Sequence, residues 1–240
     1  MEVMQAVHDS LVGNTILEPT DLYVRFLPQD SLQLNILKYD IGLELFDYPL
    51  DLDIPEDEVY VDPTIPEGDF TWLYTTVNPN FDFPEDMPYE ILEQCYIPDE
   101  EEAIVVTRGG STIDIERAAF ERLGYTIDPD EPLTRAWFER PKGTIRVFDN
   151  SPSEQKYVPV KGVKIRCNTL VKWSTAYTNE NGEYSMGSRF SIGPHYAIVF
   201  DNAKDFDIWG NWGPIARANY NMGWHNKKGY SKDIPTSSQT

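Results

Sequence analysis

The sequence predicts a mostly β fold with some α-helix, in which an acidic α+β N-terminal region is followed by an antiparallel β-sandwich. Three observations support this prediction. Residues 141–200 contain several strand-like segments, prolines cut residues 1–105 into short pieces, and the charge of the chain changes near Glu100. The chain has 240 residues, 40 % of them hydrophobic and 13 % aromatic, which is enough to build a substantial core.

The first expected elements are a strand and a short helix. Residues 22–27 are rich in strand-forming side chains and end at Pro28, which cannot donate a backbone hydrogen bond. Asp30 or Ser31 is suited to cap a helix through Lys38, because its side-chain oxygen can accept a hydrogen bond from a free backbone N–H.

Further short elements are expected before residue 105. The apolar run 42–46 and the β-prone run 71–77 indicate extended segments, and residues 89–96 are predicted to form one or two helical turns. Extended loops should separate these pieces, because the region is broken by Pro49, Pro55, Pro63, Pro66, Pro79, Pro84, Pro88 and Pro98.

A helix is predicted over residues 112–123. Ile115, Ala119 and Leu123 fall at i, i+4 and i+8, and Gly124 can close the C-terminal end in the left-handed conformation. The favoured interpretation is a connector that packs its thin apolar stripe on a neighbouring region. The alternative is a partner-binding helix.

Four strand signals follow the connector and share a high content of β-branched and aromatic side chains. They lie at residues 143–150, 157–167, 174–186 and 195–200. In the second signal, Val163, Ile165 and Cys167 alternate with Lys164 and Arg166, which predicts one buried face and one face in water.

The strand at residues 195–200 is predicted to be central in its sheet. Its larger apolar residues alternate with Ala197 and Val199, which are also apolar, so both faces should be covered. Between the third and fourth signals, Asn181 and Gly182 predict a hairpin turn, because they readily adopt the positive φ angles of a tight reversal.

Three short motifs in this segment resemble a known family. They are Pro-x-x-Gly-Val-x-Ile from Pro159, Thr-x-x-x-Gly-x-Tyr from Thr178 and Tyr-x-Ile-x-Phe from Tyr196. In these motifs, residues 141–208 resemble the carboxypeptidase regulatory-like domains. The resemblance implies a prealbumin-like β-sandwich that serves as a scaffold, and it names no activity because one fold hosts many functions. Residues 168–173 are inserted where the family often has a short loop.

A second resemblance covers the order of segments in the N-terminal region, at residues 22–30, 43–51, 62–68 and 89–100. In this order the chain resembles the N-terminal part of large surface lipoproteins from Bacteroidota. The resemblance implies an extracytoplasmic place at the cell surface and a downstream region that can carry a metallopeptidase-like zinc motif. The sequence has no His-Glu-x-x-His motif, and His8, His195 and His225 are not at zinc-ligand spacing.

Charge is distributed unevenly along the chain. Residues 1–105 contain 25 acidic and two basic residues, whereas residues 106–240 contain 15 acidic and 18 basic residues. The net charge of -20 argues against nucleic acid as a partner, because the phosphate backbone would be repelled. The step near Glu100 predicts one boundary. Together with the connector helix, the strand signals and the aromatic C-terminal stretch, it divides the chain into four parts, at residues 1–105, 106–140, 141–208 and 209–240.

Membrane and export signals are absent from the sequence pattern. No run reaches the roughly 18 apolar residues that a membrane-spanning helix needs. Glu2 and Asp9 do not fit a signal peptide, so the chain is either cytoplasmic or has had its export signal removed. The resemblance to surface lipoproteins favours export. Cys95, in a predicted helix, and Cys167, in a predicted strand, are expected to be buried and unpaired rather than bridged.

Catalytic residues are not predicted. There is no Gly-x-Ser-x-Gly elbow, and His195 is expected to bind a loop backbone. Paired carboxylates for glycoside hydrolysis remain an alternative, although sequence separation does not give the distance between them. Calcium is the one cofactor considered, because hard cations take oxygen ligands, and the candidate ligands are Asp51, Asp53, Asp57 and Asp62. The favoured interpretation of these carboxylates is a solvated acidic loop.

Aromatic residues near the C-terminus form a candidate ligand surface. Rings can bind the apolar faces of sugars, while neighbouring amides bind hydroxyl groups. The candidate residues are Trp212, Tyr220, Trp224 and Tyr230, interleaved with Asn211, Asn219, Asn221 and Asn226. The favoured alternative is that these rings pack against the sandwich or against a downstream domain.

The sequence therefore predicts a non-catalytic accessory, scaffold or adhesion portion of an exported bacterial cell-envelope protein, with a protein or glycan partner at the cell surface. One alternative is part of a secreted, metallopeptidase-like hydrolase whose active site lies outside this chain. The other is a glycan-binding module that uses the C-terminal aromatic residues.

Overall fold

The computed structural model describes residues 1–56, 58–66, 68–107, 109–125, 140–199, 201–202, 206–207, 219–225 and 228–235. The described part of the chain is mostly β, as the sequence predicts. Its helices are α1 (Glu2–Leu11), α2 (Ser31–Asn35), the π-helical turn η1 (Ile36–Asp40) and α3 (Ile115–Arg122). Its strands are β1 (Asp21–Phe26), β2 (Leu73–Val77), β3 (Tyr89–Cys95), β4 (Ile104–Val106), β5 (Thr112–Asp114), β6 (Lys142–Asp149), β7 (Lys156–Pro159), β8 (Lys164–Thr169), β9 (Lys172–Tyr177), β10 (Glu183–Ser185), β11 (His195–Val199), β12 (Asp201–Asn202), β13 (Phe206–Asp207), β14 (Asn219–Trp224) and β15 (Lys232–Ile234).

The N-terminal region contains an antiparallel sheet in the order β2-β1-β3. The predicted strand at residues 22–27 is confirmed as β1, and the predicted cap is confirmed at Asp30, whose Oδ1 accepts a 2.8 Å hydrogen bond from Gln33 N. The apolar run 42–46 forms no strand and contributes a single bridge between Phe46 and Tyr74. One hydrophobic core lies between this sheet and α2, formed by Leu22, Val24, Phe26, Leu34, Leu37, Leu45, Leu73, Val77 and Met87.

Strand β3 corrects one prediction. Residues 89–96 are not helical, because residues 89–95 pair with β1 from Phe26 opposite Tyr89 to Asp21 opposite Cys95. The helix propensity of the Glu, Leu and Gln residues in this segment is outweighed by the backbone hydrogen bonds that it makes with β1. Stacking of Tyr89 on Phe83, with ring centroids 4.1 Å apart, fixes the start of the strand.

The connector helix is shorter than predicted. Residues 112–114 form β5 and pair with β4, and α3 begins after Asp114, which caps it by accepting from Arg117 N at 3.0 Å. Gly124 has φ +88°, as expected for a residue that closes a helix. Helix α1, which the sequence analysis did not predict, packs Val7 against Ile115 and Ala119 of α3.

Residues 140–235 contribute two four-stranded sheets. One has the order β14-β11-β8-β9, and the other has the order β10-β6-β15 with β7 also paired to β6. The second sheet is mixed, because β15 runs parallel to β6, so the prediction of a wholly antiparallel arrangement is wrong there. Strands β14 and β15 belong to residues 209–240, so parts of the predicted extension complete both sheets.

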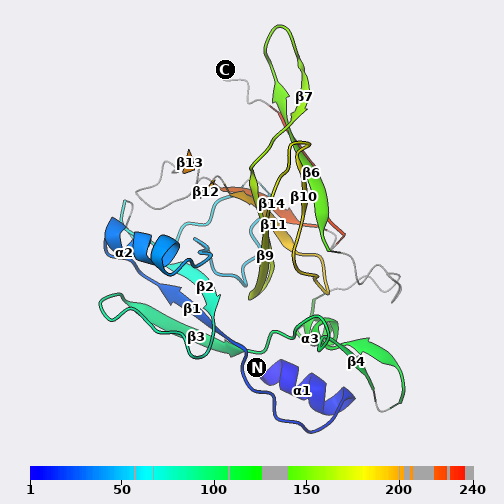
Figure 1. Ribbon diagram of the computed structural model, residues 1–240. Coiled ribbons are helices and arrows are strands. Elements are labelled where there is room, and N and C mark those ends of the chain that lie inside the picture. The colour runs from blue at the N-terminus through cyan, green and yellow to red at the C-terminus, as the bar shows by residue number, and fades with distance from the viewer. Residues whose placement is uncertain are drawn as a thin grey trace.

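The two sheets share one hydrophobic core. Ile145 and Tyr184 come from the mixed sheet, whereas Ile165, Tyr196 and Met222 come from the antiparallel sheet. The turn at residues 179–183 forms as predicted, with Gly182 at φ +71°, but its two flanking strands enter different sheets, so it is not a hairpin. The β6–β7 hairpin projects at one end of the molecule, and α1 lies at the other (Figure 1).

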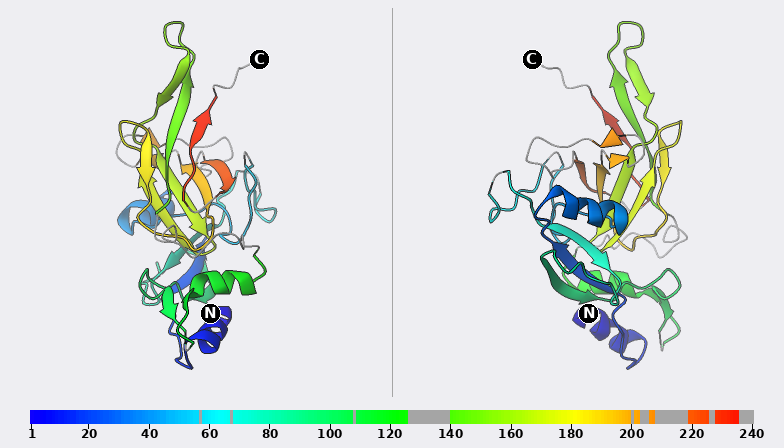
Figure 2. Two further views of the ribbon diagram at one scale, coloured as in Figure 1. Left: turned by 90° about the vertical axis from the view of Figure 1, so that its right-hand side faces the viewer. Right: turned by 60° about the vertical axis from the view of Figure 1, so that its left-hand side comes forward.

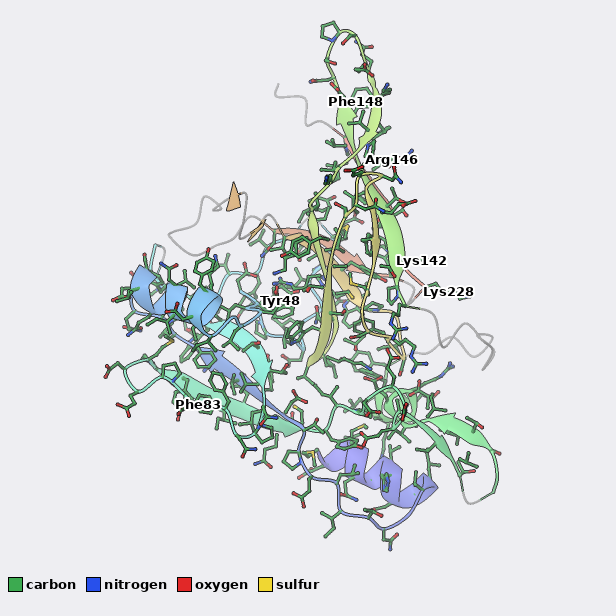
Figure 3. The ribbon with its side chains drawn as sticks, in the orientation of Figure 1. Tyr48, Phe83, Lys142, Arg146, Phe148 and Lys228 are labelled. Carbon is green, nitrogen blue, oxygen red and sulfur yellow. The ribbon has the colours of Figure 1, made fainter. Side chains whose placement is uncertain are left out.

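Strand β8 is buried on both faces. Lys164 and Arg166 are only 8 % and 1 % exposed, so the prediction that they lie in water is wrong. The face that carries them is covered by residues 44–50 of the N-terminal region. Tyr48, which belongs to this segment, is labelled in Figure 3 beside the strands. Strand β11 is central, between β14 and β8, and all five of its residues are buried, as predicted.

Candidate functional site

The N-terminal region, helix α3 and the β8–β9 turn line an open cavity of about 600 Å³. Most of its wall comes from the first turn of α1, residues 93–98 at the end of β3, helix α3 and residues 169–172, and Tyr23 and Asp51 complete it. These elements lie close together at the lower end of the molecule in Figure 2, where α1 is next to α3. A second cavity of about 410 Å³ adjoins the first and shares Ile97, Pro98, Val171 and Lys172.

A buried ion pair lies on the wall of the larger cavity. Lys172 Nζ is 2.9 Å from Glu116 Oε2, and Ser191 Oγ donates to the same oxygen at 2.6 Å. Burial raises the pKa of Glu116, and the nearby ammonium of Lys172 opposes this shift. The carboxylate is therefore held between two donors, and Ser191 is bound as a donor rather than activated as a nucleophile.

Local structure explains how these side chains reach the wall. The Asp114 cap sets the start of α3 and so places Glu116 in its first turn. The β8–β9 connection is tight, with Leu170 at φ +46°, and it returns the chain so that Lys172 opens β9 facing Glu116. The insertion noted in the sequence therefore supplies part of the cavity wall.

The cysteines are buried and free, as predicted. Cys95 lines the cavity, and burial raises its pKa to about 11. Burial also raises the pKa of Cys167, which packs in the core of the two sheets. A thiol with a raised pKa carries little thiolate at neutral pH, so neither group has the properties of a nucleophile.

A second polar cluster lies under the N-terminal region, on the charged face of β8. Lys164 Nζ is 2.5 Å from Glu44 Oε2, and Arg166 Nη1 donates to Leu45 O at 2.9 Å and contacts Glu44 Oε1 at 3.5 Å. The guanidinium also lies 4.0 Å from the centre of the Phe46 ring. This cluster fixes the N-terminal region on the sheet and is closed to solvent.

His195 lies beside β8 in the same layer and is not one of the residues that line the cavity. Its Nε2 is 3.3 Å from Ile54 O, in agreement with the expectation that it binds loop backbone. Burial, together with the nearby Arg166 charge, lowers its pKa to about 4. The imidazole is therefore neutral at pH 7 and donates to the carbonyl of Ile54.

The proposed calcium ligands are not gathered into a site by the described residues. Asp51 and Asp53 are exposed, Asp62 is buried and accepts hydrogen bonds from Thr64 N and Oγ1, and Asp57 lies outside the described residues. Among the residues that the structure describes, no group of three or more His, Cys, Asp or Glu side chains is arranged to hold a metal ion.

The predicted aromatic residues are placed in different surroundings. Tyr220 and Tyr230 pack against the core of the two sheets, and Trp224 lies edge-on to His195 with ring centroids 6.1 Å apart. Trp212 lies outside the described residues. The described rings agree with the packing alternative, and a glycan site at these positions stays a prediction.

Sequence patterns did not point to the cavity residues. Glu116 belongs to the predicted helix, but nothing in the spacing connects it to Lys172, 56 residues later, or to Ser191. The inserted segment 168–173 was the single signal in the sequence that could have indicated this site, because extra residues in a tight connection between strands add local surface there.

Comparisons with known proteins leave the family open. No protein-family model and no curated protein matches the chain. Among solved structures, a 9R-lipoxygenase from Cyanothece PCC8801 is similar with a TM-score of 0.21 and 13 % identity, over 50 % of this chain and 20 % of the lipoxygenase chain. The chain thus spans a fifth of that protein. A TM-score of 0.21 is too low to support any inference about fold or function. In the described residues, no helix combines the length and hydrophobicity needed to cross a bilayer.

Proposed function

We propose that the chain is a non-catalytic binding and scaffold portion of an exported bacterial cell-envelope protein, and that the cavity is its ligand site. The cavity is the observation that carries the proposal. Its volume of about 600 Å³ falls within the roughly 300–1,000 Å³ range of small-molecule sites. Among the ionisable groups that line it, Glu116 and Lys172 neutralise one another instead of being poised for proton transfer.

The scaffold part of the proposal follows from how the two regions are joined. The prealbumin-like sandwich is proposed for the two sheets that share the Ile165 and Tyr196 core. The N-terminal region is fastened to it by the Glu44 cluster with Lys164 and Arg166. A rigid body of this kind can hold a binding site in a fixed orientation at a cell surface, and the resemblance to surface lipoproteins supports that location.

Ligand binding is tested with the fluorescent probe 1-aminoanthracene and the full chain. We expect saturable fluorescence enhancement that is lost in Leu123→Trp, because Leu123 lines the cavity and is 49 % exposed, so the larger ring can block the opening without disturbing the core. Leu32→Trp, at a 70 % exposed position outside the cavity, is the matched control and should bind normally. Absence of saturable binding to the unaltered chain would overturn the proposal.

Location is tested separately in the cells that encode the chain. After fractionation and immunoblotting, we expect the protein in the envelope fraction and sensitive to protease added to intact cells. Recovery in the cytosol alone would overturn the envelope part of the proposal while leaving the cavity as a binding site.

A further inference from the structure

We infer that the cavity binds a small organic cation, an amine with an apolar body, and this inference rests on the proposed binding function. The wall offers a largely apolar surface for such a body. It is lined by Val3 and Met4 of α1, Ala119 and Phe120 of α3, and Leu170 and Val171 of the β8–β9 turn. Burial of an apolar group against this surface is favourable because it removes apolar area from water.

Charge around the cavity favours a cation. Four carboxylates line it, from Glu2, Asp51, Glu93 and Glu116, against the ammonium groups of Lys172 and the N-terminus. Lys172 pairs with Glu116 at 2.9 Å, and the N-terminal ammonium pairs with Glu93 at 3.2 Å. Glu2 and Asp51 have no ion-pair partner among the described residues, so the local excess of charge is negative.

The surrounding field has the same sign. Residues 1–105 carry 25 acidic and two basic residues, and this region supplies α1 and β3 to the cavity wall. A negative potential raises the local concentration of cations and repels anions. An anionic ligand of similar shape would therefore bind more weakly than its amine.

One buried hydroxyl oxygen on the cavity wall lacks a hydrogen-bond donor within the described part of the chain. Thr169 is 1 % exposed, lines the cavity, and its Oγ1 has no hydrogen-bond partner among the described residues. A buried polar atom without a partner is costly, and an ammonium group brings three donors.

The test compares three compounds that share one apolar body and differ in the head group: 3-phenylpropylamine, 3-phenylpropanol and 3-phenylpropanoate. Their affinities for the full chain are measured at pH 7 by isothermal titration calorimetry. We expect the amine to bind at least about tenfold more tightly than the alcohol, and the acid to bind most weakly, with the preference for the amine falling as salt screens the charges.

Variants locate the site and its acceptor. Thr169→Val should weaken the amine about fivefold and the alcohol less, without loss of melting temperature, because it replaces an unpartnered hydroxyl by an isosteric methyl group. Leu123→Trp should weaken both compounds, and Leu32→Trp neither.

Failures of the two proposals give different results. Equal or tighter binding of the alcohol or acid would overturn the cation inference and leave the cavity as a binding site. Amine binding that is insensitive to Leu123→Trp would place it elsewhere and also overturn the inference. If none of the three compounds and no 1-aminoanthracene binds, the proposed binding function falls as well.

Discussion

Arg166 carries a full charge at the centre of the molecule, where it depends on a small set of partners. Its side chain is 1 % exposed, and its contacts are the Leu45 carbonyl, the Glu44 carboxylate and the ring of Phe46. Loss of Arg166 would leave the buried Leu45 carbonyl without its donor and Phe46 without its cation contact, whereas Glu44 would keep its 2.5 Å pair with Lys164.

We therefore expect Arg166→Met to lower the free energy of unfolding by about 1–3 kcal/mol. Arg146→Met is the matched control, because the Arg146–Asp233 pair has side chains 48 % and 38 % exposed, so water screens the pair and its loss should change stability much less. Urea unfolding monitored by fluorescence measures both values. Equal losses in the two variants would show that the Arg166 cluster does not stabilise the fold.

His195 predicts a pH dependence of stability. Its pKa in the folded protein is about 4, below the ordinary value of 6.5, so between these values the unfolded chain binds the extra proton. The contribution of His195 to the free energy of unfolding is therefore fully present above pH 6.5 and is lost as the pH falls toward 4. At about 1.4 kcal/mol per pKa unit, the total loss is about 3 kcal/mol.

The measurement is the free energy of urea unfolding at several values between pH 7 and pH 4, for the unaltered chain and for His195→Gln. The variant cannot titrate at this position, so its curve should be flatter over the same interval. Parallel curves would contradict the assigned role of His195.

At the scale of elements, close contact between backbones decides where the strands of the mixed sheet lie. A Cβ atom on Gly143 of β6 would stand 1.9 Å from the carbonyl oxygen of Tyr230. The chain that leads into β15 can approach β6 so closely only because this position lacks a side chain.

Gly143→Ala should therefore destabilise the protein by about 1–3 kcal/mol, since the backbone of residue 230 has to move. Gly187→Ala is the control, because its added methyl group would meet nothing nearer than Ser174 Oγ at 3.9 Å, and it should change stability by less than about 0.5 kcal/mol. Thermal unfolding by circular dichroism compares the two. A silent Gly143→Ala would contradict this account of the sheet.

At the scale of the whole molecule, the N-terminal region and the two sheets share buried surface. Phe46, Tyr48 and Leu50 from the N-terminal region form one cluster with Tyr23, and Trp173 of β9 packs against it. The charge step near Glu100 marks a change of composition, but the described residues on its two sides are packed together.

We accordingly expect a single cooperative thermal transition for the full chain. Differential scanning calorimetry should give equal calorimetric and van't Hoff enthalpies, because neither region can lose its contacts without exposing the charged face of β8. Two separated transitions would mean that the regions unfold independently. The Arg166→Met variant provides a second test, because it should lower the midpoint temperature of this single transition without splitting it in two.

The sequence by itself determined the features that depend on neighbours along the chain. Strand β1, the Asp30 cap, the closing Gly124 and the turn at Gly182 follow from local propensity, capping and backbone freedom, and the unbroken apolar character of β11 was enough to predict a central strand. Charge composition likewise showed that the N-terminal region is acidic.

Only the tertiary structure decided what covers each surface. Alternation in β8 correctly separates two faces, but it cannot show that Glu44, 120 residues away, reaches Lys164 and removes the charged face from water. Strand β3 and the Glu116–Lys172 pair depend on contacts of the same kind. Such contacts bring together residues with no fixed spacing in the chain, and the cavity exists because of them.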